Sequence, residues 1–396
     1  MKIRDSDEIY AYLKDANLRI KKIGKQRITI KNFDFSSEKF GGSWGYFDFV
    51  DCDFTSTWDI RLDWLNNCTF TNCHFSGIFD MGGAKKVLFS RCKVDGNPSG
   101  LIFDSQTDGL VFENCEFINP DSDPNHPDAI NCEGKILLRN CKARYFSLDG
   151  HKALSLKGCT IVGSQLGSAS PATFSDKSKM PYSDFLIEDC DLRGGAEISN
   201  AQLQSFILRN SKVGILKTWR STIRDAVLVE DIHEGFISLA STTITNSLTV
   251  RNCSFYAQRE GHSFKCNIDT PARSVIENIK CGSAPVDVIC SGGAMKESDW
   301  LPVASNKFAL IKNSKIPHLR ADWAQTEHLR IENCELGEVY IRDGRIGKLE
   351  IIGCSLMKLD VSRTQVKEQD VRIREGGKIS GHVTVTEGSN IKLTPR

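Results

Sequence analysis

One short phrase recurs along the chain, and this repeat restricts the fold more than any other feature of the sequence. In each copy, alternating apolar residues precede a residue that is usually Asn, Asp or Gly, and the next residue is usually Cys, as in segments 69–75, 110–117 and 248–253. Fifteen copies occur between Phe49 and Gly376, with a basal spacing of 20 to 22 residues and occasional insertions. Such a period predicts stacked units, each contacting only its neighbours, rather than several globular domains.

The pattern inside each copy is that of a strand followed by a tight turn. Alternating apolar positions have the two-residue period of a strand, whereas ankyrin and tetratricopeptide units need a helical period that the copies lack. Asn, Asp and Gly tolerate the left-handed turn conformation, and Cys is small enough to stack inside the molecule on its equivalent one coil away. We therefore expect an all-β solenoid of about fifteen coils. A five-residue spacing of Phe and Leu, typical of pentapeptide repeats, is confined to residues 49–75.

These features resemble the right-handed parallel β-helix superfamily, which includes pectate-lyase-like enzymes and phage tailspikes. The segment His126-Pro-Asp128-Ala-Ile130 is similar to the His-x-Asp-x-Ile turn of many carbohydrate-active and phage-associated members. The resemblance implies rigid coils whose function is carried by inserted loops, and a homotrimer if the protein is of the virion type.

The ends of the chain lack the repeat and are expected to cap the solenoid, because an open end would expose unpaired backbone groups. Capping residues precede Ile9, Tyr12 and Leu13 at helical spacing, which predicts a short helix within residues 5–22. The expected organisation is an N-terminal cap over 1–30, a β-helix over 31–380 with loop insertions at 118–131, 164–184 and 281–307, and a final strand or tail over 381–396.

Charge and cysteine usage exclude several classes of protein. The 51 Lys and Arg residues balance 50 Asp and Glu residues, which argues against a strongly basic nucleic-acid-binding protein. The sequence has neither a membrane-spanning apolar run nor the apolar core of a secretory signal, so we expect synthesis in the cytoplasm, no membrane insertion and, for the virion type, a final place in a virion. The 15 cysteines are odd in number and lack zinc-ligand spacing, so we expect neither a disulfide scaffold nor a zinc site.

Five polar residues near the first insertion form the candidate catalytic site: His126, Asp128, Asp149, His151 and Lys152. In carbohydrate-active β-helix proteins, a carboxylate and a basic residue on adjacent coils handle sugar acids, and the resemblance implies that role here. If Asp128 and Asp149 face one groove, they can act as acid and base on a glycosidic bond, with the histidines as proton carriers and Lys152 stabilising negative charge. The alternative is that these residues make only turn and capping hydrogen bonds.

The same insertion contains a candidate calcium site. Asp121, Asp123 and Asn125 place oxygen ligands at alternate positions, as at the start of a calcium-binding loop. His126 and Cys132 stand where such a loop requires Gly and Glu, so Ca²⁺ is the one cofactor hypothesis, and the expectation is otherwise that the protein has none.

Three functions fit this sequence. The first is a structural or adhesion protein of the phage-virion type, such as a tailspike, fibre or capsid decoration, with polysaccharide or other virion proteins as partners. The second is a polysaccharide lyase, hydrolase or epimerase, although the chain lacks the catalytic series typical of polygalacturonases. The third is a scaffold that offers a long face to a protein partner.

Overall fold

The computed structural model is an all-β parallel solenoid of about 11 turns, with one short helix near the N-terminus. It describes residues 6–14, 26–35, 42–55, 60–62, 64–95, 101–104, 106–117, 128–132, 134–149, 153–161, 172–175, 183–233, 235–239, 242–255, 264–267, 273–282, 286–290, 307–322 and 324–373. Two compact units are present, unit 1 over Met1–Ala196 and unit 2 over Glu197–Arg396.

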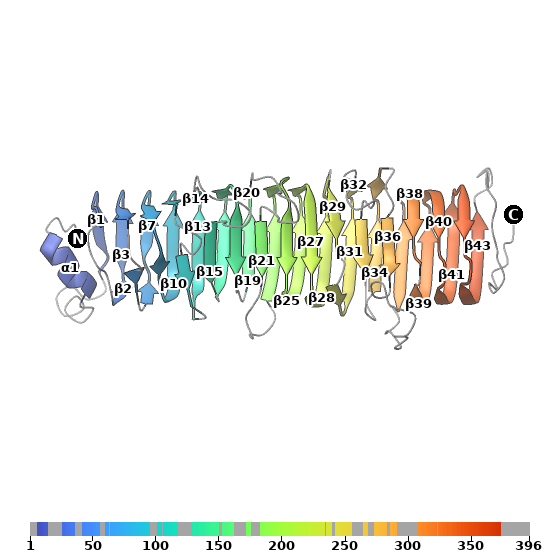
Figure 1. Cartoon of the computed structure of the whole chain (residues 1–396), viewed down its shortest axis with the longest axis horizontal. Helices are drawn as coiled ribbons and strands as arrows, with labels where there is room; N and C mark the ends of the chain where they lie inside the picture. The colour runs from blue at the N-terminus through green and yellow to red at the C-terminus, as the bar shows by residue number, and fades with distance from the viewer. Residues whose placement is uncertain are drawn as a thin grey trace. The chain divides into compact units, whose positions relative to one another are not determined.

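Unit 1 contains the helix α1 (Ser6–Lys14) and three parallel sheets (Figure 1). Sheet A consists of β1 (Ile28–Lys31), β2 (Ser43–Gly45), β3 (Phe47–Val50), β6 (Trp64–Asn66), β7 (Thr69–Thr71), β10 (Gly83–Ser90), β13 (Asp108–Glu113), β16 (Lys135–Arg139), β19 (Ala153–Lys157) and β22 (Ser183–Glu188). Sheet B consists of β4 (Asp53–Thr55), β8 (His74–Ser76), β11 (Lys93–Val94), β14 (Glu116–Phe117), β17 (Lys142–Ala143), β20 (Thr160–Ile161) and β23 (Asp191–Leu192). Sheet C consists of β5 (Ile60–Arg61), β9 (Phe79–Asp80), β12 (Leu101–Phe103), β15 (Asp128–Cys132), β18 (Phe146–Asp149) and β21 (Ala172–Ser175).

Unit 2 repeats this arrangement, and β24 (Ala196–Ser199) spans the boundary. Its sheet A consists of β25 (Gln202–Arg209), β28 (Ser221–Glu230), β30 (Thr242–Ile244), β31 (Ser247–Arg251), β34 (Arg273–Glu277), β37 (Phe308–Lys312), β39 (Gln325–Glu332), β41 (Arg345–Cys354) and β43 (Gln365–Ile373). The other strands are β26 (Lys212–Val213), β27 (Ile215–Trp219), β29 (Phe236–Ser238), β32 (Ser254–Phe255), β33 (Phe264–Asn267), β35 (Lys280–Cys281), β36 (Val286–Cys290), β38 (Lys315–Arg320), β40 (Glu335–Tyr340) and β42 (Lys358–Asp360).

Each repeat copy lies on a strand of sheet A that pairs in parallel with the strand one copy further on. In unit 1, for example, Phe49 pairs with Phe70 and Phe89 with Phe112. The parallel solenoid is therefore confirmed, whereas about 11 turns is fewer than the expected fifteen.

In the copies whose break residue the structure describes, that residue takes the left-handed conformation expected of it. Asn72, Asn140 and Asn333 have φ angles of 54°, 51° and 50°. Arg91, one of the exceptions in the sequence, adopts the same conformation with φ of 53°, and Gly353 has φ of 63°. A residue at this position turns the chain so that every copy enters the next sheet at the same point.

The interior of unit 1 is filled by columns of aromatic rings. The ring centroids of Phe49 and Phe70 are 4.9 Å apart, those of Phe70 and Phe89 4.7 Å, and those of Phe89 and Phe112 4.6 Å, and all three pairs are stacked. These four side chains are fully buried. Because each ring contacts the ring of the next turn, the column ties successive turns together.

The cysteine after each turn lies inside, as the sequence indicates. Thirteen described cysteines are free and buried. In unit 1 several thiols bond to a carbonyl of the strand one turn earlier: the Cys92 Sγ donates to the Phe70 carbonyl at 3.4 Å, and the Cys115 Sγ to the Phe89 carbonyl at 3.4 Å. The thiols thus act as small core residues that also bond between turns.

Part of the sequence-based domain organisation falls on described residues. The helix expected within 5–22 is present as α1, which ends at Lys14, and the tail over 381–396 lies outside the described residues. The segments expected as loop insertions at 164–184 and 281–307 contain β21 and β36, which pair with β18 and β33. These segments therefore contribute strands to the solenoid.

We expect Phe89→Ala to destabilise the protein by about 3 to 5 kcal/mol, because it leaves a cavity in the middle of the ring column. The free energy of unfolding can be measured by urea denaturation. The matched control is Leu88→Ala on the outer side of the same strand, which should cost much less; equal losses at the two positions would contradict the assigned inward and outward faces.

Burial raises the pKa of the Cys253 thiol to about 12. An unfolded thiol ionises near pH 8.5, so between about pH 8.5 and 12 the unfolded chain binds fewer protons than the folded one. The free energy of unfolding should therefore fall as the pH rises through this range.

Cys253→Ser tests this dependence, because Ser211 occupies the equivalent turn position and its hydroxyl donates to the Arg209 carbonyl at 2.8 Å. The variant should show a shallower decline of stability between pH 9 and 11 in chemical denaturation. An unchanged slope would show that the Cys253 thiol already ionises normally in the folded protein.

Candidate functional site

The structure describes only two residues of the sequence-based candidate sites. Asp128 begins β15 and Asp149 ends β18, and these strands are parallel neighbours in sheet C of unit 1. Asp128 is in register with Phe146, and Asp149 with Asn131. The two aspartates are thus three positions apart along adjacent strands, with Cα atoms about 11 Å apart. The residues that lie outside the described ranges are His126, His151 and Lys152 of the catalytic hypothesis and Asp121, Asp123 and Asn125 of the calcium hypothesis.

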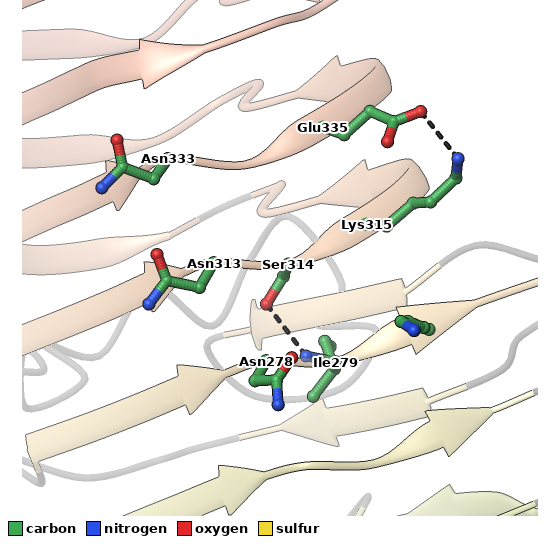
Figure 2. A pocket seen from close by; sticks show the side chains of 8 residues that line it. Asn278, Ile279, Asn313, Ser314, Lys315, Asn333 and Glu335 are labelled. Carbon is green, nitrogen blue, oxygen red and sulfur yellow. Dashed lines mark hydrogen bonds and ion pairs between the residues drawn. The ribbon is translucent and has the colours of Figure 1, made fainter.

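Unit 2 carries a polar groove with a volume of about 440 Å³ beside the turns that precede β35, β38 and β40. Three asparagines one turn apart follow one side of it, Asn278, Asn313 and Asn333, all with φ near 50° (Figure 2). The remaining lining residues are Ile279, Lys280, Ser314, Lys315 and Glu335. The amide groups thus follow one side of the groove, and the Lys315 ammonium and Glu335 carboxylate lie on the other side (Figure 2).

The contacts inside the groove are mostly those of the solenoid itself. The Ile279 N–H donates to the Ser314 Oγ at 3.2 Å, and the Lys315 ammonium lies 2.8 Å from the Glu335 carboxylate (Figure 2). Both partners of that ion pair are more than half exposed, so it contributes little to stability. The groove offers hydrogen-bonding groups to a polar ligand and holds no buried charge that would mark a catalytic centre among its lining residues.

The outer face of sheet A in unit 2 carries a column of apolar side chains. It consists of Ile207, Leu228, Thr249, Val275 and Leu310, which are in register on consecutive strands. Each is partly exposed and lies between buried neighbours, as Ile207 does between Phe206 and Leu208. We name these five residues the apolar stripe. Contiguous apolar surface of this kind is typical of a contact site.

A column of charges runs directly beside the apolar stripe, two residues further along each strand. It consists of Arg209, Glu230, Arg251, Glu277, Lys312 and Glu332, which are also in register. We name these six residues the charge ladder. The sign of the charge alternates from one strand to the next, beginning with positive Arg209 and ending with negative Glu332.

Neighbouring charges of the ladder pair with one another. The Arg251 guanidinium lies 2.6 Å from the Glu230 carboxylate, and the Lys312 ammonium 2.9 Å from Glu277. The Glu230 carboxylate raises the pKa of Arg251. Since these groups are partly exposed, the pairs keep the column ordered rather than supplying much folding energy.

Unit 1 has an apolar column at the equivalent position of its own sheet A, formed by Leu88, Val111, Leu137, Ser155 and Leu186. The accompanying charges are Glu113, Arg139, Lys157 and Glu188, with ion pairs of 3.0 Å between Arg139 and Glu113 and between Lys157 and Glu188. Here the sign order is negative, positive, positive, negative. The two units therefore share the apolar column and differ in their charge order.

The outer face of unit 2 also contains a carboxylate held by a lysine, an arginine and a histidine. Glu350 is 8% exposed and accepts from His328 Nε2 at 2.7 Å, Lys348 Nζ at 2.8 Å and Arg330 at 3.4 Å. Burial alone would raise the pKa of Glu350, but the hydrogen bonds from Lys348 and His328 hold it below its usual value. The carboxylate is thus kept ionised and serves to anchor β39 to β41.

Comparison with known proteins identifies no relative of this chain. No protein-family model matches the chain, and no match exists among curated proteins or solved structures. Within the described ranges no helix is long and apolar enough to cross a bilayer. The described side chains also bring together no group of three or more His, Cys, Asp or Glu that could hold a metal ion.

Sequence reasoning did not identify the apolar stripe and the charge ladder. The repeat nevertheless contains a signal for them. Copies such as Phe206-Ile-Leu-Arg209 and Val227-Leu-Val-Glu230 have three consecutive apolar residues. A strand with one solvated face needs apolar residues only at the first and third of these positions, which face the core. The middle residue of each triplet is the one that faces outward.

Proposed function

We propose that the chain is a structural β-solenoid that assembles or adheres through the outer face of sheet A, as a tailspike, fibre or capsid-decorating protein of a phage virion would. The observation that carries this proposal is the apolar stripe with its charge ladder. A monomer that functioned alone would gain nothing from a column in which four of five in-register residues are aliphatic, whereas a binding partner would remove these side chains from water.

The interior of unit 1 and the outer faces of both units support a mechanical role. Stacked rings such as Phe70 and Phe89 tie neighbouring turns on the inside, and ion pairs such as Arg251 with Glu230 tie them on the outside. A stack of turns held in this way resists bending and keeps residues on its surface at fixed spacing. These properties suit a protein that presents a face rather than one that closes around a substrate.

Two classes of partner are consistent with this role. Other virion proteins or further copies of the chain fit the apolar stripe, and the homotrimer expected from the resemblance is one such assembly. Polysaccharide fits the polar groove, because exposed amides such as those of Asn313 and Asn333 can donate to and accept from sugar hydroxyls.

We expect substitution of the stripe to abolish assembly while leaving the fold intact. Leu228→Lys and Val275→Lys each place a charge in the apolar stripe without touching the core. Sedimentation velocity should show a loss of the larger species, and pull-down of candidate virion proteins should weaken. Circular dichroism checks the fold, and Lys212→Ala, on the surface of β26, serves as a control. Assembly and binding unaffected by both stripe substitutions would refute the proposal.

A second candidate, a polysaccharide lyase, hydrolase or epimerase, rests on the sequence-based hypothesis for Asp128 and Asp149, which lie three positions apart on adjacent strands of one sheet. If this function is correct, incubation with acidic polysaccharides should yield new reducing ends, unsaturated products or epimerised residues. Asp128→Ala and Asp149→Ala should then each reduce turnover by a factor of about 100 or more. Turnover that persists in both variants, or none in the unaltered protein, would exclude this pair as the catalytic residues.

A further inference from the structure

We infer that two copies of this chain pair face to face through the charge ladder and apolar stripe of unit 2, with their turns in opposite order. The two-fold axis runs along the strand direction and passes between Arg251 and Glu277. This inference rests on the proposed function and specifies its partner and symmetry.

The register of sheet A makes the symmetry argument possible. Arg209 pairs in register with Glu230, Glu230 with Arg251, and Arg251 with Glu277, and the series continues through Lys312 to Glu332. Successive charges are therefore one strand spacing apart, about 4.8 Å. An alternating column of this kind has a defined partner: a second alternating column shifted or reversed so that unlike charges face each other.

Reversal about the proposed axis achieves this for all six charges. It places Arg209 opposite Glu332 of the partner subunit, Glu230 opposite Lys312 of the partner subunit, and Arg251 opposite Glu277 of the partner subunit. The reciprocal contacts follow from the two-fold symmetry. Every ladder charge then has an unlike charge across the interface, and the four inner ones also have unlike charges on both neighbouring strands, an arrangement that attracts the correct partner and repels a misplaced one.

The same operation brings the apolar stripes into contact with each other. Leu228 faces Leu310 of the partner subunit, and Thr249 faces Val275 of the partner subunit. Ile207 meets Arg330 of the partner subunit, whose aliphatic stem can cover it while the guanidinium stays near Glu332 and Glu350. A two-fold axis along the stacking direction would instead make the strands of the two copies antiparallel. The two apolar stripes could then still face each other, but the two charge ladders would lie on opposite sides of the stripes and would not meet.

Unit 1 shows that this complementarity is not a general property of the solenoid. Its charges follow the order Glu113, Arg139, Lys157 and Glu188, and reversal about their centre sets Glu113 against Glu188 and Arg139 against Lys157. Like charges would face each other at every position. Pairing in reversed order is therefore specific to the ladder of unit 2.

The small area of this interface predicts that the two copies associate weakly. Six strands with about five residues each cover roughly 24 Å by 17 Å, or about 800 Å² in total for both partners, which is the size of a weak, transient interface. We expect a dimer with a Kd on the order of micromolar that weakens as salt screens the ladder. The even, two-fold arrangement also distinguishes this dimer from the homotrimer expected from the sequence.

Charge reversal next to the axis tests the inference directly. In Arg251→Glu the new carboxylate faces Glu277 of the partner subunit, and in Glu277→Arg the new guanidinium faces Arg251 of the partner subunit, so each variant alone should sediment as a monomer. When the two are mixed, unlike charges face each other at both positions, and the dimer should return to within about tenfold of the original affinity. Arg139→Glu in unit 1 is the matched control and should leave the dimer unchanged.

Cross-linking tests the order of the turns. Leu228→Cys mixed with Leu310→Cys should give a disulfide between chains at these two positions, because the buried native thiols do not compete. Cross-links of position 228 to itself would overturn the reversed order.

The outcomes separate this inference from the proposed function. A monomer or a trimer in the unaltered protein, or failure of the mixed charge variants to associate, would overturn the two-fold pairing. If Leu228→Lys still abolishes binding in that case, the proposed function stands with a different partner. If neither stripe substitution affects any assembly, both fail.

Discussion

In-register parallel pairing between successive turns is the constraint on which the rest of this structure depends. Because each strand pairs with the strand one copy later, a residue type that recurs in the repeat becomes a column in space. The left-handed turn at positions such as Asn72 and Asn333 fixes that register, and a slip by one residue would exchange the buried and exposed sides of a strand. The aromatic column, the thiols, the apolar stripe and the charge ladder all follow from this one relation.

The sequence was sufficient to predict those parts of the fold that each copy encodes for itself. Alternation identified Phe70 and Phe89 as core residues, the Asn-Cys pair identified the turn and the buried thiol, and both expectations agree with the structure. The number of turns was overestimated, because fifteen were expected and about 11 are present. Of the candidate catalytic residues, Asp128 and Asp149 were correctly expected on adjacent coils, and their role stays a prediction.

Surface columns could not be predicted in the same way because they depend on relations between distant copies. Arg251 and Glu277 are separated by 26 residues, and Glu277 and Lys312 by 35 residues, yet each pair is in register on neighbouring strands. The inserted segments hide this alignment from any fixed period. Only the backbone pairing shows that the charges alternate in sign from strand to strand in unit 2, whereas in unit 1 two positive charges lie between two negative ones. The same architecture can therefore carry surfaces with different preferences for self-association, since outward residues can change without disturbing the core.

The thiol column also has a consequence for how the solenoid opens. In unit 1 the buried cysteines 52, 73, 92, 115, 141, 159 and 190 provide one sulfur atom for each successive turn. An alkylating reagent can reach a given sulfur only when that turn has separated from its neighbours. The chain thus carries its own position-specific labels, and a short pulse of reagent followed by mass spectrometry would reveal whether the turns come apart one by one from an end or all together.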